Sequence, residues 1–318
     1  MADRRGVGGR PLGATLAVAT VLCAVPLVAR FLTGPAPVAV LAAFGTLAVL
    51  PTLVVLAVSA ATRHLTSAVA AAVLALAQLT VLIPQVASDP APAGTRLTVM
   101  TVNLNLGAAD AAAVVAAVRR HGVEVLSVQE LTVDAERRLE AAGIGTALPH
   151  KVTDPGGSAS GTGLWASRPL ERLAPWQMTF RSSAAALTVA GRRVVVRSVH
   201  PFPPRWSDDS RWRADLTALR TSVARDDDQE VTVLLGDLNA TVHHRELRRV
   251  LAEGGWRDAG ELVGAGVVRT WSPRRGIPPL FDLDHVLVPG GLGAGAHEVV
   301  DVAGSDHEGV VAEVVVPP

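Results

Sequence analysis

Polar side chains that can do chemistry stand at the ends of apolar runs throughout the second part of the sequence. They are Asn103 and Asn105, Gln129 and Glu130, His200, Asp237 and Asn239, Asp282 with Asp284 and His285, and Ser305 with Asp306 and His307. Each of these residues, taken alone, can have a purely structural role. Glu130 can be a helix-start carboxylate, and Asp237 with Asn239 can cap a tight turn. Loops at strand ends are where a rigid sheet presents catalytic groups, so six such ends in one chain favour a functional site.

The oxygen donors of this set suit a divalent metal. Carboxylate and amide oxygens, here those of Glu130, Asn103 and Asp306 or Asp237, are the ligands that Mg²⁺, Mn²⁺ and Ca²⁺ prefer. A cysteine-bound zinc is excluded, because the single cysteine, Cys23, lies in an apolar N-terminal stretch.

The histidines add the groups that phosphoryl hydrolysis needs. His200 and His307 can stabilise charge that develops on phosphoryl oxygens or can move a proton. A carboxylate such as Asp284 can hold one imidazole in the required tautomer. Together with a metal, these residues predict attack of water on a phosphate ester.

The apolar runs that carry these residues predict strands interspersed with helices. Expected strands are residues 97–106, 123–129, 164–166, 184–189, 193–199, 231–235, 282–288 and 310–316, and expected helices are 108–121, 132–142, 210–224 and 244–252. The order is not a strict alternation of strand and helix, so a doubly wound sheet is disfavoured. Two mixed β-sheets packed face to face with outer helices fit this α/β pattern better.

The order of the motifs resembles the endonuclease/exonuclease/phosphatase family, the group that includes pancreatic deoxyribonuclease. The resemblance covers roughly residues 96–316 and rests on Asn103, Gln129-Glu130, His200, Gly236-Asp237-Leu238-Asn239, Asp284 and Ser305-Asp306-His307. It implies a four-layer α/β sandwich and a divalent metal held by Glu130. Asn103 would lie close to the metal or phosphate, and Asp306 would help to hold the metal or orient His307.

The same resemblance implies roles for five catalytic residues. The residue matching Asp237 orients or activates the attacking water in the family. Asn239 and His200 would contact the phosphate, and Asp284 would pair with His307. The cofactor implied is Mg²⁺, with Mn²⁺ or Ca²⁺ as alternatives.

Two arginines are candidate substrate-binding residues. Ser167-Arg168 resembles the family's strand that ends in Ser-Arg, and Arg205 belongs to an arginine cluster that could grip a phosphate or rest on lipid headgroups. A solvated helix start is the alternative for that cluster. The sequence also departs from the family: Asn105 stands where some members have an aspartate metal ligand, and His285 where tyrosine is common.

Three apolar stretches precede these motifs. They comprise residues 12–29, 38–61 and 66–83, and only Arg30 and Arg63 interrupt them. Because each approaches the ~20 residues that a helix needs to cross a membrane, we expect three transmembrane helices. Their expected bounds are about 12–31, 38–61 and 66–86. We expect Gln78 to make a helix-to-helix hydrogen bond.

The resulting division of the chain has three parts. Residues 1–87 would form the membrane anchor, residues 88–95 a linker that is rich in proline and alanine, and residues 96–318 the catalytic domain. A cleaved signal peptide is the alternative for the first apolar stretch, but two further stretches follow it.

Basic residues near the expected spans favour a cytoplasmic N-terminus. Arg4, Arg5 and Arg10 precede the first stretch, Arg63 follows the second, and Arg30 is alone in the first loop. By the positive-inside rule, three crossings place the catalytic domain outside the cytoplasm, in a multi-pass protein of the cell membrane.

Charge also bears on the substrate. The 29 basic and 29 acidic residues balance, but residues 1–88 hold five of the basic and one of the acidic ones. The remaining chain therefore has 24 basic and 28 acidic residues, a net charge of −4. This lacks the general basic footprint of a nuclease.

The function expected is that of a membrane-anchored, divalent-metal-dependent phosphoesterase. Its partners would be the lipid bilayer and a phosphate ester, with phospholipid headgroups the most available; nothing in the sequence indicates a protein partner. A nuclease acting on extracellular DNA or RNA is one alternative. A non-catalytic, membrane-tethered binding domain on the same fold is another.

Overall fold

The chain divides into two units in the computed structural model, which describes residues 9–205, 207–223, 231–274 and 276–317. The first unit comprises the chain up to Ile83 together with residues 243–245, and the second comprises residues 84–242 and the chain from Glu246 onward. Arg4 and Arg5, which favoured a cytoplasmic N-terminus, lie outside the described residues.

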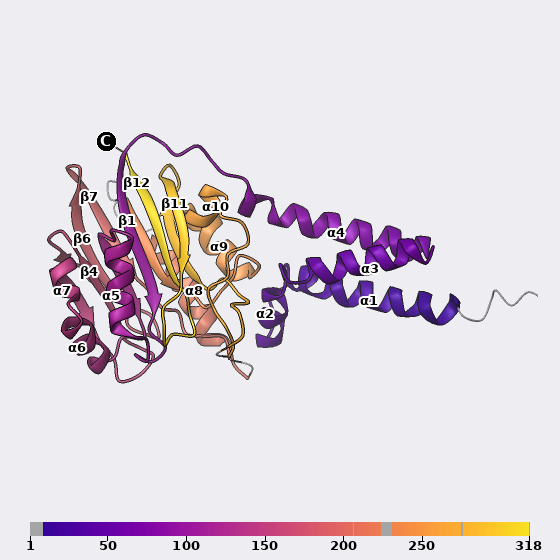
Figure 1. The fold of residues 1–318 in the computed structure, drawn as a ribbon, viewed down its shortest axis with the longest axis horizontal. Helices are drawn as coiled ribbons and strands as arrows, with labels where there is room; N and C mark the ends of the chain where they lie inside the picture. Colours follow the sequence, from indigo (N-terminus) through magenta and orange to yellow (C-terminus); the bar gives the residue numbers. More distant parts are fainter. Residues whose placement is uncertain (1–8, 206, 224–230, 275, 318) are drawn as a thin grey trace, which may run out of the picture. The chain divides into compact units, whose positions relative to one another are not determined.

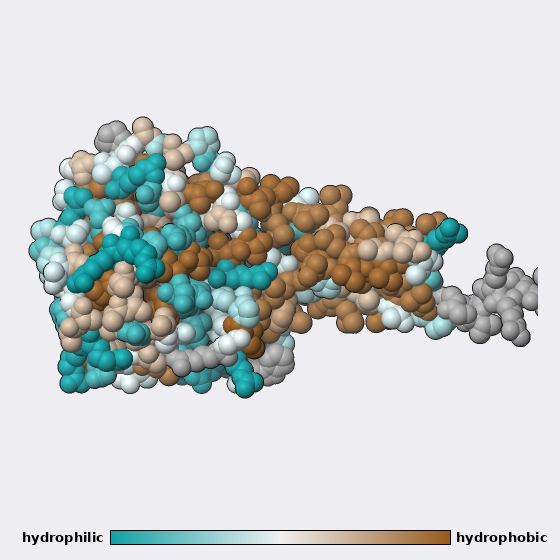
Figure 2. Space-filling model, in the orientation of Figure 1, coloured by the Kyte–Doolittle hydropathy of each residue, from teal (hydrophilic) through white to brown (hydrophobic). Residues whose placement is uncertain are grey.

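The first unit is helical. Its helices are α1 (Gly9–Ala29), α2 (Ala36–Ala43), α3 (Val49–Ala61) and α4 (Leu65–Val86) (Figure 1). Among the described residues, α1 and α4 are the two helices that are long and apolar enough to cross a membrane by length and composition. Figure 2 shows apolar side chains over the surface of these helices.

The prediction that residues 38–61 form one continuous transmembrane helix is wrong. Residues 38–61 are divided between α2 and α3 by a turn at residues 44–48. Gly45 within this turn is a poor helix former, and Pro51 lies in the first turn of α3, where a helix tolerates proline best. The 13 residues of α3 extend about 20 Å, less than the ~30 Å of a hydrocarbon core.

Helices α1 and α4 run in the same direction. The Gln78 side-chain amide donates to the Cys23 carbonyl at 3.0 Å, which confirms the expected helix-to-helix hydrogen bond. Nearer the helix starts, a Cβ added to Gly13 would lie 3.0 Å from the His64 ring. Later residues of α1 therefore meet later residues of α4.

The second unit contains two six-stranded sheets. In spatial order the first has β11 (Gly293–Val300), β12 (Gly309–Val316), β1 (Thr95–Asn103), β2 (Val125–Gln129), β4 (Thr162–Ala166) and β3 (His150–Asp154). The second has β5 (Glu171–Arg172), β6 (Ser183–Val189), β7 (Arg192–Ser198), β8 (Val231–Asp237), β10 (Asp284–Pro289) and β9 (Trp256–Asp258). Both are mixed, because β1–β2 and β7–β8 pair in parallel while their other pairs are antiparallel.

The two sheets enclose one apolar core. Val99 and Val314 of the first sheet and Val196, Val233 and Val286 of the second belong to the same buried cluster. Successive side chains of a strand point to opposite faces, so these alternate residues line the space between the sheets. The predicted α/β fold of two mixed sheets packed with helices is thereby confirmed.

Helices cover the sheets from outside. On the first sheet, α5 (Ala111–Arg120), α6 (Val133–Ala141) and α7 (Ile144–Ala147) bury Val118, Leu139 and Ile144 in one cluster with Leu126 and Trp165 (Figure 1). The N-caps of α5 and α6 are Asp110 and Thr132, whose side chains accept hydrogen bonds from the first turns. Three further helices are α8 (Ser210–Val223), α9 (Arg245–Gly254) and α10 (Ala259–Val263).

The elements that the sequence did not predict are short or rich in small residues. They are β3, β5, β9, β11, α7 and α10. The edge strand β11 contains Gly-Ala-Gly-Ala, which has little of the β-branched character typical of strands. Residues 87–94, close to the expected linker, form no helix or strand, but Asp89 N donates to Leu262 O at 2.8 Å.

Candidate active site

The predicted strand-end residues meet where the two sheets end together. Asn103 and Gln129 are register partners at the ends of β1 and β2. Asp237 at the end of β8 is the register partner of Asp284 at the start of β10. The amide of Asn103 donates to Asp237 Oδ2 at 3.0 Å, and this bond joins residues of the two sheets.

Asp237 is the centre of the site. Its side chain is buried, and its Oδ1 accepts a hydrogen bond of 2.8 Å from the Asn239 backbone. Its Oδ2 lies 3.4 Å from His200 Nε2 and 3.6 Å from His307 Nε2, in addition to the bond from Asn103. One carboxylate is thus surrounded by three side-chain donors.

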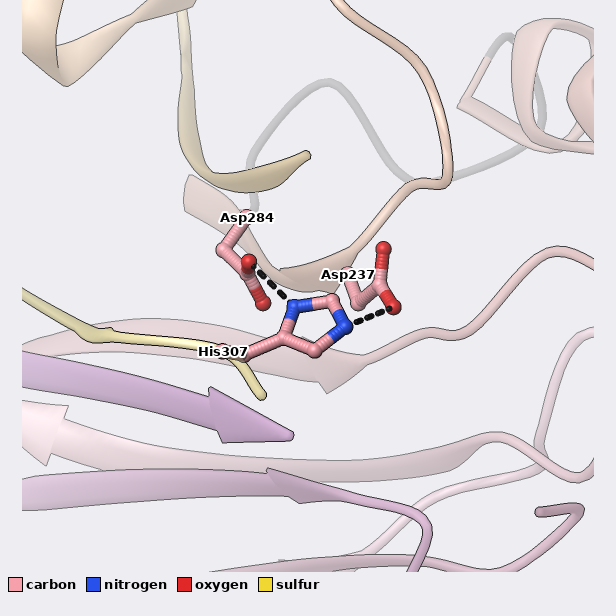
Figure 3. Close-up of side chains that lie close together, drawn as sticks. All are labelled: Asp237, Asp284 and His307. Atoms are coloured by element: carbon pink, nitrogen blue, oxygen red, sulfur yellow. Dashed lines mark hydrogen bonds and ion pairs between the residues drawn. The ribbon is translucent and has the colours of Figure 1, made fainter. Parts of the chain in front are cut away.

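His307 bridges two carboxylates (Figure 3). Its Nδ1 lies 2.8 Å from Asp284 Oδ2, while its Nε2 is directed toward Asp237. The Ser305 hydroxyl accepts from the His307 backbone at 2.9 Å and donates to the Asn103 carbonyl at 2.7 Å. These contacts fix the imidazole in one orientation, as the sequence predicted for the pair of His307 and Asp284.

The charges of this cluster are strongly coupled. Burial alone would raise the pKa of Asp237, but the neighbouring His307 and His200 and the Asn239 amide lower the pKa to about 2. Burial alone would lower the pKa of His307, but the carboxylates of Asp284 and Asp237 raise the pKa to about 10. At neutral pH Asp237 is therefore ionised and His307 is protonated.

These pKa values predict how stability depends on pH. The raised pKa of His307 stabilises the fold fully below about pH 6.5, and this contribution is lost as pH rises through 10. The lowered pKa of Asp237 stabilises it above about pH 4, and this contribution is lost as pH falls through 2. We expect thermal unfolding of the full chain in detergent to show a Tm plateau between about pH 4 and pH 6.5. Above this range, we expect the Tm to fall by an amount on the order of 5–10 °C as pH rises through 10.

Substitution identifies the source of the alkaline fall. His307→Gln should remove part of the alkaline fall in Tm, because the glutamine amide does not titrate between pH 6.5 and 10. His150→Gln, which changes a histidine at the start of β3, is the matched control and should keep the wild-type profile. An unchanged alkaline profile in His307→Gln would refute the raised pKa.

Glu130 follows Gln129, the register partner of Asn103, and lies outside this cluster. Its backbone has a φ of +55°, and its Oε2 accepts a hydrogen bond from the Leu106 backbone. Asn239 also has a positive φ, of +49°. Positive φ is uncommon outside glycine and is often found at functional sites, where the surrounding structure maintains it.

The donor sets distinguish between two possible metal positions. Within the described residues, Asp237, Asp284 and His307 form the group whose ligand atoms all lie within 4.8 Å of one another. Both nitrogens of His307 already face carboxylates, and a protonated imidazole has no lone pair for a metal. Glu130 with Asn103 offers a carboxylate and an amide oxygen, the hard donors that Mg²⁺ uses alongside water and phosphate.

Asp306 was predicted to help hold the metal, and the structure gives it another contact. Its Oδ2 accepts from the Trp271 indole at 3.4 Å, and it lies outside the group around Asp237. Its negative charge also helps to raise the pKa of His307. This placement fits an influence on His307, which was the second role that the sequence analysis considered.

Arg168 does not reach the site, which corrects its prediction as a substrate-binding residue. Strand β4 is antiparallel to β2, with Ala166 opposite Val125, so Arg168 lies beyond the start of β2. The Asp237 cluster lies at the other end of that strand, where Gln129 pairs with Asn103. Arg168 instead donates to Glu124 at 2.8 Å.

Arg205 is placed near His200 by aromatic contacts. Its guanidinium lies 5.0 Å from the ring centroid of Phe202, and Phe180 lies 5.1 Å from Phe202 and 5.0 Å from His200. Trp206, which belongs to the same sequence cluster, lies outside the described residues.

A buried polar network beneath the site was not predicted. The Ser127 hydroxyl donates to Ser198 Oγ across the two sheets at 2.8 Å, and the Gln129 amide donates to both serines. Thr101 donates to Gln129 Oε1 at 3.0 Å. Scattered serines in apolar strands resemble ordinary small residues in a sequence, so only their convergence identifies them.

A second buried Asp–His pair lies next to the site. His285 Nδ1 is 2.8 Å from Asp258 Oδ2, and its Nε2 is 2.8 Å from the Ala240 carbonyl. Both partners are acceptors, so both nitrogens donate and the imidazole is protonated. Burial opposes this charge, but Asp282 and Asp258 raise the pKa of His285 to about 10. The contact fixes Ala240, directly after the turn that carries Asp237 and Asn239.

Solved structures share this fold. TDP2 from D. rerio, in a complex with a single-strand DNA product, is 15% identical with a TM-score of 0.56, covering 70% of this chain and 100% of that chain. An endonuclease/exonuclease/phosphatase from Beutenbergia cavernae is 22% identical with a TM-score of 0.53, covering 70% and 72%. A family member from Leptotrichia buccalis is 14% identical with a TM-score of 0.52, covering 69% and 100%. A search of the curated proteins finds none that matches this chain.

The two facing sheets with outer helices define an α/β sandwich, and the Asp–His cluster lies where the sheets end. The sequence pattern of the endonuclease/exonuclease/phosphatase family matches residues 100–307. The chain belongs to this family, and it is a hydrolase that acts on phosphate ester bonds.

Proposed function

We propose that this protein is a membrane-anchored phosphoesterase that uses a divalent metal and attack by water. The observation that carries the proposal is the buried, ionised Asp237 between His200 and a protonated His307, which Asp284 orients. This arrangement places an acceptor for the protons of water next to two groups that can interact with phosphoryl oxygens.

Each residue has a chemical task in the proposal. Asp237 accepts a hydrogen bond from the attacking water and thereby orients it. His307 supplies positive charge, or a proton, to the phosphoryl oxygens, and Asp284 holds its ring. His200 and Asn239 contact the phosphate from the turns after β7 and β8. Asn103 holds Asp237 in place through the bond between the sheets.

Glu130 and Asn103 are the residues that would hold the metal. A divalent cation there would supply positive charge to the phosphate and to the developing negative charge. The buried Asp284 Oδ1 and His200 Nδ1 have no partner in the described protein, so the site retains unused polar atoms for substrate or water.

Replacement of Glu130 tests the metal assignment. Glu130→Gln removes the carboxylate charge but keeps its size, so we expect activity at saturating substrate to require roughly 10- to 100-fold more Mg²⁺. Mg²⁺ titrations of initial rate measure this change, and Glu124→Gln, at the opposite end of β2, is the matched control. An unchanged Mg²⁺ midpoint in Glu130→Gln would remove Glu130 from the metal site.

The enzyme proposal is tested with full-length protein in detergent. Wild type should release nitrophenol from bis(p-nitrophenyl) phosphate in the presence of Mg²⁺, Mn²⁺ or Ca²⁺, and chelation should abolish the reaction. Equally slow release by wild type and Asp237→Ala would favour the alternative of a non-catalytic binding domain.

A nuclease is the second candidate function. The TDP2 structure with a single-strand DNA product shows that a protein of this fold binds DNA. The net charge of −4 beyond residue 88 opposes general binding of nucleic acid. A panel of plasmid DNA, RNA, phospholipids and nucleotides distinguishes the candidates, and faster cleavage of DNA or RNA than of any lipid would favour the nuclease.

The anchor proposal rests on the direction of the helices. If the parallel helices α1 and α4 both cross the bilayer, their N-terminal ends face the same side and the chain after α4 lies on the opposite side. Arg63 precedes α4 as Arg10 precedes the apolar part of α1, so positive charge gathers at the starts of both spans. These features support a cytoplasmic N-terminus and a catalytic domain outside.

A reporter fusion tests this topology. Alkaline phosphatase joined after Pro318 should be active, and the same reporter joined after His64 should be silent, because His64 precedes α4 on the cytoplasmic side. The reverse pattern would overturn the orientation. Release of the protein from membranes by high salt or alkaline carbonate would overturn the anchor itself.

A further inference from the structure

Two guanidinium groups lie against one aromatic ring beside the catalytic cluster. Arg205 Cζ and Arg211 Cζ are 5.0 Å and 5.3 Å from the centroid of the Phe202 ring. Both arginines are exposed. Two cations that lie near one ring repel each other, and an anion bound between or beside them would relieve this repulsion. We call Phe202, Arg205 and Arg211 the arginine platform.

The protein itself supplies little compensation for these charges. Within the described part of the chain, neither Arg205 nor Arg211 forms an ion pair with a carboxylate. Hydrogen bonds from Ser210 lower the pKa of Asp208, and the nearby Arg211 makes the smallest contribution to this shift. Arg213 on the same helix differs, because it pairs with Asp209 at 2.6 Å.

The platform has a rigid base. Asp215, which is buried in α8, accepts a hydrogen bond from the Phe202 backbone at 2.8 Å. Its other oxygen accepts from the backbone and hydroxyl of Thr179, at 2.8 Å and 3.0 Å. The next residue, Phe180, packs its ring 5.1 Å from Phe202. Phe202 is therefore held in place from two segments.

The same short segment connects the platform to the catalytic residues. His200 faces Asp237, and Pro201 accepts a hydrogen bond of 3.0 Å from the Asn239 side chain. Phe202 follows directly. Two residues of chain extend at most about 7 Å, so the platform and His200 can contact neighbouring groups of one small molecule.

We infer that the arginine platform binds a second phosphate group on the substrate, next to the phosphate that is hydrolysed. The inference rests on the proposed function and narrows its substrate class to esters with two phosphates. Guanidinium groups bind phosphate through paired N–H donors, and the Phe202 ring keeps them oriented. A substrate with one phosphate would leave the platform unused.

A pair of chromogenic nucleotides isolates the second phosphate. Thymidine 5′-(p-nitrophenyl phosphate) has one phosphate, and its 3′-phosphorylated analogue has two. With full-length protein, Mg²⁺ and detergent, we expect wild type to hydrolyse the second ester with the higher kcat/KM. Arg205→Ala/Arg211→Ala should lower kcat/KM for that ester about 10- to 100-fold and leave the first ester unchanged. Arg220→Ala, on the same helix but paired with Glu253, is the control.

Binding separates this inference from the proposed function. Thymidine 3′,5′-bisphosphate should bind wild type about 10-fold or more tightly than thymidine 5′-phosphate, and the double variant should lose this preference. If neither ester is hydrolysed but thymidine 3′,5′-bisphosphate still binds more tightly in an arginine-dependent way, the proposed function is wrong. The inference that the arginine platform binds a second phosphate is then still supported. Equal losses for both esters, or no loss of the preference in the variant, overturn the platform.

Vesicles identify the source of the second phosphate. Phosphatidylinositol 4-phosphate and phosphatidylinositol in otherwise identical vesicles differ by one phosphate on the headgroup. If phosphatidylinositol 4-phosphate is hydrolysed faster than either thymidine ester, and this rate depends on the two arginines, the substrate with two phosphates is an inositol lipid. The opposite ranking indicates a nucleotide, and both rankings support a two-phosphate substrate.

Discussion

Asp237→Asn should lower kcat by about 10³- to 10⁴-fold with little change in size at the site. The amide cannot carry the negative charge that His200, His307 and Asn103 surround, and it brings its own N–H donors toward theirs. Initial rates with bis(p-nitrophenyl) phosphate and saturating Mg²⁺ measure the loss.

The control for this variant is another aspartate outside the site. Asp301→Asn changes an exposed carboxylate just after β11 and should keep wild-type rates. Circular dichroism of both variants verifies the fold. More than a tenth of wild-type activity in a folded Asp237→Asn protein would exclude Asp237 from the chemical step.

His307→Gln should reduce kcat by about 10²- to 10⁴-fold, because it removes the protonated imidazole. Asp284→Asn should produce a loss of similar size, because the ring loses the carboxylate that orients it and maintains its charge. The two residues act as a unit, so the double variant should be little worse than the poorer single variant.

The double variant shows whether the losses of kcat in His307→Gln and Asp284→Asn depend on each other. Rates of both single variants and the double variant form a cycle, with His150→Gln as the control for replacing a histidine. Multiplied losses in the double variant would mean that Asp284 and His307 act independently, contrary to the 2.8 Å contact between them.

Much of the fold could be predicted because its signals are local. The run from Val231 to Leu235 is apolar at most positions and bounded by polar residues, which indicated the buried strand β8. Thr132 caps the helix that follows it, at the predicted start of that helix. The short edge elements were missed because propensity is weak in Gly- and Ala-rich segments such as β11.

The anchor shows where a local signal is insufficient. Residues 38–61 have the length and hydropathy of one span, yet the chain forms α2, a turn and α3. Composition counts apolar residues, whereas the point at which a helix ends depends on single positions such as Gly45 and Pro51. A window of average hydropathy does not detect that effect.

The sequence by itself determined which residues end the strands and therefore which side chains can do chemistry. Only the tertiary structure decided which of them meet. Asn103 and Asp237 are 134 positions apart, and their hydrogen bond depends on how two sheets face each other. Arg168 also follows a strand, but that strand is antiparallel to β2 and carries it to the opposite end. Strand direction and register arise from contacts distant in sequence, so no local pattern encodes them.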